Sequence, residues 1–254
     1  MTPIKLYKYK AINKFFIDSL VNGTIYFARP DELNDPFDCK VDIKNSISNA
    51  AKSLDGTDKQ KLIELLKDEE VFDNLKNDIN NLGVCSFSGV FKCDQQEVLM
   101  WTHYANNHRG VCIKYEFPWN FVDKDDEIVS CSNVSYDPEA LTTWFKSSEI
   151  LSLDFNSEEF IMELAKKMLT IKSPSWCYES EIRIIRRKRG SFKIPKLYIR
   201  GICFGLETPV SDIELIRKIV NNFYSNVDFY KNNRGNSDFG LDIGEYNIAL
   251  PSDS

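Results

Sequence analysis

Apolar and polar residues alternate in several short runs along the chain, and this alternation predicts a β-rich body. Successive side chains of a strand point to opposite faces, so such runs are typical of strands with one buried face. They lie at residues 6–9, 24–28, 83–88, 111–116, 128–136, 178–185, 196–199, 201–205, 227–230 and 246–250. Gly, Pro or Asn residues follow most of these runs, as expected where strands end in turns.

Two longer segments, at about 45–82 and 138–172, carry apolar residues at the spacing of three and four that is typical of amphipathic helices. We interpret them as helical insertions on the β-rich body. Shorter helices are predicted near residues 13–22, 97–105 and 211–223. The sequence therefore predicts an α+β fold with a mixed or antiparallel sheet core, in a single domain spanning residues 1–254.

Composition narrows the class of protein. The chain has 254 residues, 43% of them apolar, which is enough for a substantial core. It has no 18-residue apolar run and no apolar signal region at its N-terminus, so we expect a cytoplasmic protein without membrane contact. Seven cysteines without a Cys-x-x-Cys pair argue against a structural zinc site and against a disulfide framework.

The net charge of −6 argues against a general polyanion binder. A local basic segment departs from this balance, with Arg183, Arg186, Arg187 and Arg189 close together in the sequence. These residues could contact nucleic acid, or they could face solvent at the end of a strand. The sequence leaves both interpretations open.

Both histidines of the chain, His103 and His108, lie within six residues of each other, beside Trp101 and Tyr104. Histidine titrates near neutral pH, which favours a functional role. A Trp-x-x-Tyr pair at helical spacing is equally typical of a core. Asp35 or Asp38 could complete a metal site with the histidines. However, a separation of five residues places two ligands poorly on one helix face.

Glu179, Glu181 and Arg183 form a second candidate site. They are spaced by two residues in the run that begins at Tyr178, so we expect them to share one face of a strand. Adjacent carboxyls raise the pKa of one member, and the arginine lowers the pKa of the other, which separates an acid role from a base role. The alternative is three solvated charges on an exposed strand face.

Several segments together resemble the bacterial domain-of-unknown-function 2971 (DUF2971) family, from about residue 4 to about residue 207. The resemblance rests on Leu6-Tyr7-Lys8-Tyr9, Asn34-Asp35-Pro36-Phe37-Asp38, Cys85-Ser86-Phe87-Ser88, Leu99-Met100-Trp101-x-His103-Tyr104 and Trp176-x-Tyr178-Glu179-x-Glu181-x-Arg183. Members of the family are often found in mobile and phage-defence settings. The resemblance therefore implies a defence or toxin role.

The order of elements also resembles the ADP-ribosyltransferase fold, which includes DNA-modifying toxins. The resemblance rests on an aromatic-basic pair in the first strand, a helix that ends in Gly, and a late Glu-x-Glu strand. It implies NAD as the nucleotide used, with Glu181 polarising the nicotinamide ribose and Glu179 or His103 deprotonating the acceptor. Lys8 stands where the fold normally has Arg or His. Cofactor-binding roles are implied for Tyr7, Lys8, Ser86, Ser88, Trp101, Tyr104, His108 and Arg183.

We therefore predict an NAD-using ADP-ribosyltransferase or NAD hydrolase that acts on a nucleotide-type small molecule and holds no metal. One alternative is a metal-dependent nuclease or hydrolase built on His103 and His108. Another is a non-catalytic binding module in which the histidines and their aromatic neighbours belong to the core. The sequence does not indicate an oligomeric state.

Overall fold

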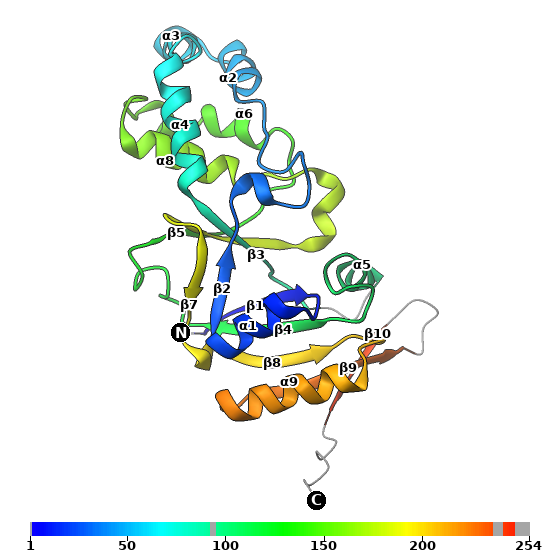
Figure 1. Ribbon diagram of the computed structural model, residues 1–254. Coiled ribbons are helices and arrows are strands. Elements are labelled where there is room, and N and C mark those ends of the chain that lie inside the picture. The colour runs from blue at the N-terminus through cyan, green and yellow to red at the C-terminus, as the bar shows by residue number, and fades with distance from the viewer. Residues whose placement is uncertain (1, 92–94, 236–240, 247–254) are drawn as a thin grey trace, which may run out of the picture.

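The computed structural model describes residues 2–91, 95–235 and 241–246. Within these residues, eight strands form one sheet in the order β10-β9-β8-β4-β1-β3-β6-β5 (Figure 1). β8 and β9 run parallel, and the other neighbours are antiparallel, so the sheet is mixed. The strands are β1 (Ile4–Lys10), β3 (Gly83–Ser88), β4 (Val111–Phe117), β5 (Ile128–Asn133), β6 (Glu181–Arg186), β8 (Ile199–Phe204), β9 (Asp228–Arg234) and β10 (Leu241–Glu245). The predicted α+β class is confirmed.

A small ribbon stands apart from this sheet. It consists of β2 (Thr24–Phe27), paired antiparallel with β7 (Gly190–Lys193). A bridge between Ala28 and Val84 links the end of β2 to β3. Phe27 is buried, whereas its neighbour Tyr26 is half exposed, so the two faces of β2 have different surroundings.

Three helices pack on the part of the sheet that contains β1, β4 and β8. α1 (Lys14–Asn22) and α9 (Val210–Phe223) pack against each other, and both contribute to a core with β4 and β8. α5 (Gln95–Tyr104) contributes to a separate core with Tyr9, Cys112 and Cys203. Because side chains alternate along a strand, these two cores lie on opposite faces of the sheet.

The remaining α-helices form a layer at the end of the sheet that carries β3, β6 and β5 (Figure 1). They share one apolar core, which also takes in Val84 and Ile185 from the sheet. No helix in the described part of the chain has the length and apolar content needed to cross a membrane. The helices of this layer are α2 (Ile43–Lys52), α3 (Gly56–Leu65), α4 (Glu69–Asn81), α6 (Ala140–Phe145), α7 (Ser148–Leu151) and α8 (Glu158–Met168).

The sheet is split between β1 and β3. β1 pairs with β4 along its whole length, but in the described residues it pairs with β3 at a single position, Tyr7 with Ser88. Beyond this position the two strands diverge, and the Lys8 ammonium donates a hydrogen bond of 2.6 Å to the carbonyl of Ser86. A side chain thus satisfies a backbone acceptor that a continuous sheet would satisfy through its ladder.

Two predicted strand boundaries are wrong. The run from Tyr178 begins as the 3-10 helix η2 (Pro174–Glu179), so Glu179 precedes β6 instead of lying in it. Pro174 favours the helical turn, and the left-handed backbone of Ser180, with φ of 44°, ends it. The strand predicted at 196–199 is mostly the 3-10 helix η3 (Lys196–Tyr198). Residues 247–250 of the predicted last strand lie outside the described residues. A further 3-10 helix, η1 (Pro30–Glu32), follows β2.

Arg183 joins the sheet to the helical layer. Its side chain starts from β6 and is fully buried. The guanidinium donates to the Asp38 carboxylate at 2.6 Å, to the carbonyl of Leu169 at 2.8 Å and to the Glu181 carboxylate at 2.7 Å. Asp38 lies in the segment before α2, and Leu169 follows α8. One side chain therefore ties both ends of the helical layer to β6.

Replacing Arg183 with Met should lower the free energy of unfolding by about 3–5 kcal/mol, because two carboxylates would stay buried without their cation. Urea denaturation measures this loss. Lys188→Met is the control, since it removes an exposed ion pair with Glu127 and should cost less than about 1 kcal/mol. Equal losses in the two variants would contradict the role given to Arg183.

Candidate functional site

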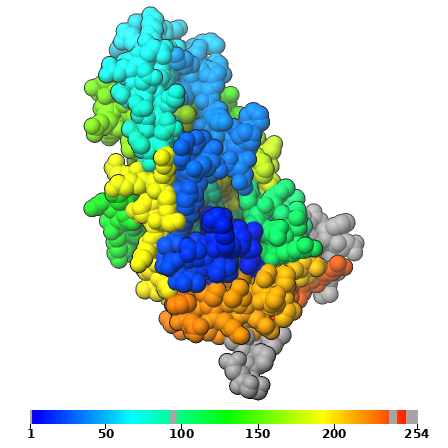
Figure 2. All heavy atoms as spheres, viewed as in Figure 1, coloured from blue at the N-terminus to red at the C-terminus, as the bar shows by residue number. Residues whose placement is uncertain are grey.

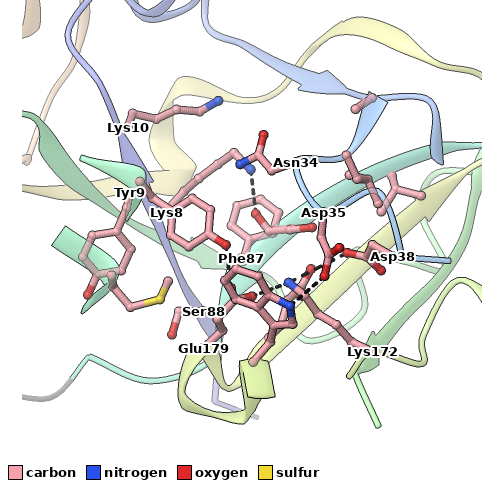
Figure 3. A pocket seen from close by; sticks show the side chains of 18 of the residues that line it. Lys8, Tyr9, Lys10, Asn34, Asp35, Asp38, Phe87, Ser88, Lys172 and Glu179 are labelled. Atoms are coloured by element: carbon pink, nitrogen blue, oxygen red, sulfur yellow. Dashed lines mark hydrogen bonds and ion pairs between the residues drawn. The ribbon is translucent and has the colours of Figure 1, made fainter. Parts of the chain in front are cut away.

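A pocket of about 400 Å³ opens where β1 and β3 diverge. We call it the carboxylate pocket, because Asp38, Glu179 and Glu181 line it together with Lys8 and Lys172 (Figure 3). In the space-filling view the surface is hollowed between the blue N-terminal segments and the green α5 segment (Figure 2). The volume lies within the range of small-molecule sites.

A buried ionic network forms the floor of the carboxylate pocket. The Lys172 ammonium lies 2.6 Å from a carboxylate oxygen of Glu179 and 3.0 Å from one of Glu181. It also lies 3.8 Å from Asp38. Arg183 contacts Glu181 and Asp38 from the other side. Each of these side chains is at most 6% exposed, so the network is largely shielded from water and its interactions are strong.

The two glutamates differ in their proton affinity. Burial opposes a charge on Glu181, but Arg183, Lys172 and a hydrogen bond from Ser86 lower its pKa to about 2. For Glu179, burial raises the pKa, and Lys172 and Tyr104 compensate only in part. Glu181 is therefore ionised at neutral pH, and Glu179 is the member of the pair that takes up a proton more readily.

The charges in the network explain this difference. Three carboxyl groups face two cations, so one negative charge has no full counterpart. Burial lowers the pKa of Lys172, but Glu181 and Glu179 raise it above its ordinary value, which keeps the ammonium charged. Glu181 contacts both cations, whereas Glu179 contacts Lys172 and the Tyr104 hydroxyl.

Two aromatic side chains form one wall of the pocket. The Tyr104 hydroxyl, at the end of α5, donates to Glu179 at 2.5 Å. The Trp176 indole donates to Asp35 at 2.7 Å, and the Lys172 ammonium lies 5.1 Å from the centre of its ring. Asp35 also accepts from the backbone of Phe37, as expected for a turn-forming aspartate. Polar contacts at the ring edges thus fix the positions of Tyr104 and Trp176.

A second pocket of about 670 Å³ adjoins the first. We call it the α1 pocket, because Asn13, Phe15 and Ser19 of α1 and its cap line it. The two pockets share a wall of six residues, namely Lys8, Tyr9, Lys10, Tyr26, Asn34 and Tyr104. They therefore adjoin each other along β1, and we call the two pockets together the cleft.

Residues 100–184 match a family described as "Protein of unknown function (DUF2971)". This segment is similar to the DUF2971 family. The predicted family resemblance is confirmed there, and the segment runs from α5 into β6. No curated protein and no solved structure matches the chain. The resemblance to the ADP-ribosyltransferase fold stays a prediction.

Residues 100–184, the DUF2971 segment, supply the aromatic wall of the carboxylate pocket and all of its floor except Asp38. Tyr104, Lys172, Trp176, Glu179 and Glu181 all lie within it. Lys8, Ser86 and the other residues of β1 and β3 that line the pocket precede it in the sequence. The family segment therefore contains both glutamates and Lys172, and residues before position 100, Asp38 among them, complete the lining.

Seven of the predicted site residues line the carboxylate pocket together. They are Tyr7, Lys8, Ser86, Ser88, Tyr104, Glu179 and Glu181. Tyr7 also stacks on Phe91, with ring centres 5.1 Å apart, and the Ser88 hydroxyl bonds to the carbonyl of Val90. His103 lines the α1 pocket instead, and its ring lies 6.3 Å from that of Trp176.

Three predicted residues do not line either pocket. Trp101 is fully buried and packs edge-on against Tyr9, so it cannot stack on a ligand. His108 stacks on Trp101 and contacts the Thr102 hydroxyl at 3.3 Å. Arg183 is also fully buried and fully bonded, so it is not free to hold a pyrophosphate. Arg183 instead positions Glu181 and Asp38.

The predicted basic surface is not continuous. Arg187 and Arg189 are exposed, but Arg183 and Arg186 are buried. Arg186 pairs with Asp125 at 2.5 Å and lies 4.0 Å from the centre of the Phe192 ring. Side chains alternate between the faces of β6, yet both of its arginines pair with carboxylates. The proposed nucleic-acid contact through these four residues therefore loses two of its cations.

Lys172 is the main residue that the sequence did not indicate. It follows Thr170 and Ile171 at the end of a helical segment, where a lysine is usually solvated. Its burial depends on Glu179 and Glu181, which meet it after the chain turns through η2. Two close carboxyl groups need a neighbouring cation, so the pair Glu179 and Glu181 was the sequence signal that could have pointed to a buried lysine.

The pKa of Glu181 predicts how stability depends on pH. Its pKa in the folded protein, about 2, lies below the ordinary value of 4.5. The ionised carboxylate therefore adds stability above about pH 4.5, and this stability is lost as the pH falls toward 2. Wild type should lose about 2 kcal/mol more than Glu181→Gln between pH 6 and pH 3 in urea denaturation. Parallel losses in the two proteins would contradict the ionised state of Glu181.

Proposed function

We propose that this protein cleaves the bond between nicotinamide and ribose in NAD, as an ADP-ribosyltransferase or an NAD hydrolase. The observation that carries the proposal is the pair Glu179 and Glu181 on the floor of one pocket, with pKa values displaced in opposite directions. Such a pair provides a permanent anion and a proton acceptor side by side, as glycosidic chemistry requires.

Glu181 is the permanent anion in this proposal. Arg183 and Lys172 hold its carboxylate in one position. A fixed negative charge beside the ribose stabilises the positive charge that develops as the glycosidic bond breaks. Fixed groups also avoid the energetic cost of reorientation during the reaction.

Glu179 is the proton acceptor. When the bond between the ribose carbon and the ring nitrogen breaks, its electron pair leaves with neutral nicotinamide. A water or an acceptor hydroxyl then bonds to the ribose carbon, and its proton passes to Glu179. A raised pKa suits this role, because the carboxyl group must hold the proton before releasing it to solvent.

Tyr104 and Trp176 suit the aromatic part of the substrate. Both line the carboxylate pocket, and Tyr104 touches Glu179 directly. Flat aromatic side chains stack on heteroaromatic rings. A nicotinamide between this wall and β1 would place its ribose near the two glutamates.

The alternative of a metal-dependent nuclease or hydrolase has less support. The Lys172 ammonium lies between the carboxyl groups of Asp38, Glu179 and Glu181, where a cation would bind. The described residues contain no cluster of three His, Cys, Asp or Glu side chains arranged for a metal ion. His103 and His108 contact different aromatic rings. The defence or toxin setting rests on the family resemblance alone.

Release of nicotinamide from NAD tests the proposal. Glu179→Gln and Glu181→Gln should each lower kcat by about a hundredfold or more, because each removes a charged group from the reaction. Glu159→Gln, an exposed carboxyl in α8, is the matched control and should be unchanged. The rate of wild type should also fall at acid pH with an apparent pKa above 4.5, because protonated Glu179 cannot accept a proton.

Three results would contradict the proposal. The first is the absence of nicotinamide release by folded wild-type protein. The second is release that both glutamine variants retain. The third is release that a chelator abolishes and a divalent metal restores, which would favour the metal-dependent alternative.

A further inference from the structure

Two lysines stand at the junction of the carboxylate pocket and the α1 pocket. Lys8 and Lys10 are two residues apart on β1, and both line both pockets. Figure 3 shows their side chains extending side by side from the strand. A spacing of two places them on one face of β1, where β1 and β3 have diverged.

These lysines have no carboxylate partner among the described residues. The Lys8 ammonium bonds to the carbonyl of Ser86 and lies 4.9 Å from the centre of the Phe87 ring. Lys114 on the neighbouring strand β4, by contrast, pairs with Glu116 at 3.0 Å. Repulsion by Lys8, together with burial, lowers the pKa of Lys10 to about 8. The junction therefore carries positive charge that no carboxylate of the described residues neutralises.

The α1 pocket has the character of a second nucleoside site. Its walls include the aromatic residues Phe15 and Tyr115 and the polar residues Asn13, Asp18 and Thr24. Aromatic rings contact a base, and short polar side chains can bond to ribose hydroxyls. The carboxylate pocket, at about 400 Å³, is the smaller of the two.

We propose that Lys8 and Lys10 bind a diphosphate group, and that the ligand of the cleft is a dinucleotide whose second nucleoside lies in the α1 pocket. This inference rests on the proposed function for the chemistry in the carboxylate pocket, but the anion site itself does not. Ammonium groups bind phosphate as point charges. The two lysines lie between the pockets, as the diphosphate lies between the two nucleosides of NAD.

Titration calorimetry with inorganic pyrophosphate tests the anion site without any nucleoside. Lys8→Gln and Lys10→Gln should each weaken pyrophosphate binding roughly tenfold, through loss of a charged hydrogen-bond donor. Lys5→Gln, an exposed lysine on the same strand that lines neither pocket, is the control for net charge and should bind as wild type does. Equal weakening in all three variants, or no binding by wild type, would overturn the anion site.

The second half of the inference needs a variant confined to the α1 pocket. Ser191 is exposed and lines this pocket but not the carboxylate pocket. Ser191→Trp should weaken NAD binding at least tenfold by obstructing the α1 pocket, while nicotinamide mononucleotide binds as it does to wild type. Unchanged NAD binding would overturn the assignment of the α1 pocket.

The outcomes separate this inference from the proposed function. Pyrophosphate binding that depends on both lysines, without any release of nicotinamide, would support the anion site and reject the catalytic proposal. Release of nicotinamide with an unchanged KM for NAD in Lys10→Gln would support the catalytic proposal and reject the anion site. Thermal melts without ligand show whether each variant is folded.

Discussion

The buried guanidinium of Arg183 bonds to two carboxylates and a backbone carbonyl, and the organisation of the molecule depends on it. It holds Asp38 before the helical layer, Leu169 after α8 and Glu181 at the start of β6. A buried ion pair gains little stability over an apolar contact, but breaking it is costly. This interaction therefore fixes the position of the layer and of Glu181 at the same time.

The split of the sheet gives this network access to a ligand. β1 leaves β3 after Tyr7, and Lys8 bonds to a carbonyl that a neighbouring strand would otherwise satisfy. The separation exposes one edge of the ionic network to the cleft, and the rest stays buried. In our proposal, the surplus negative charge on the floor and the positive charge of Lys8 and Lys10 on β1 serve different parts of one substrate. The floor acts on the ribose, and β1 holds the diphosphate.

Local patterns predicted much of the fold. Alternation at 111–116 located β4, and helical spacing at 62–79 located α3 and α4. The two-residue spacing of Glu179 and Glu181 also predicted that they lie close together. In the structure both carboxylates contact Lys172, even though Glu179 lies outside the strand. Burial of these charges was not visible, since it depends on Asp38, which lies 145 residues before Arg183. The burial of Trp101 was not visible either, because its helical spacing fits a ligand-binding wall and a core equally well.

A thermal melt of the wild-type protein shows whether the cleft binds NAD. NAD at about 100 times its dissociation constant should stabilise the protein by roughly 2.7 kcal/mol, which raises Tm by about 5 °C or more. Divalent metals without NAD should leave Tm unchanged. An unchanged Tm with NAD at millimolar concentration, or a rise with metal alone, would contradict the binding of NAD in the cleft.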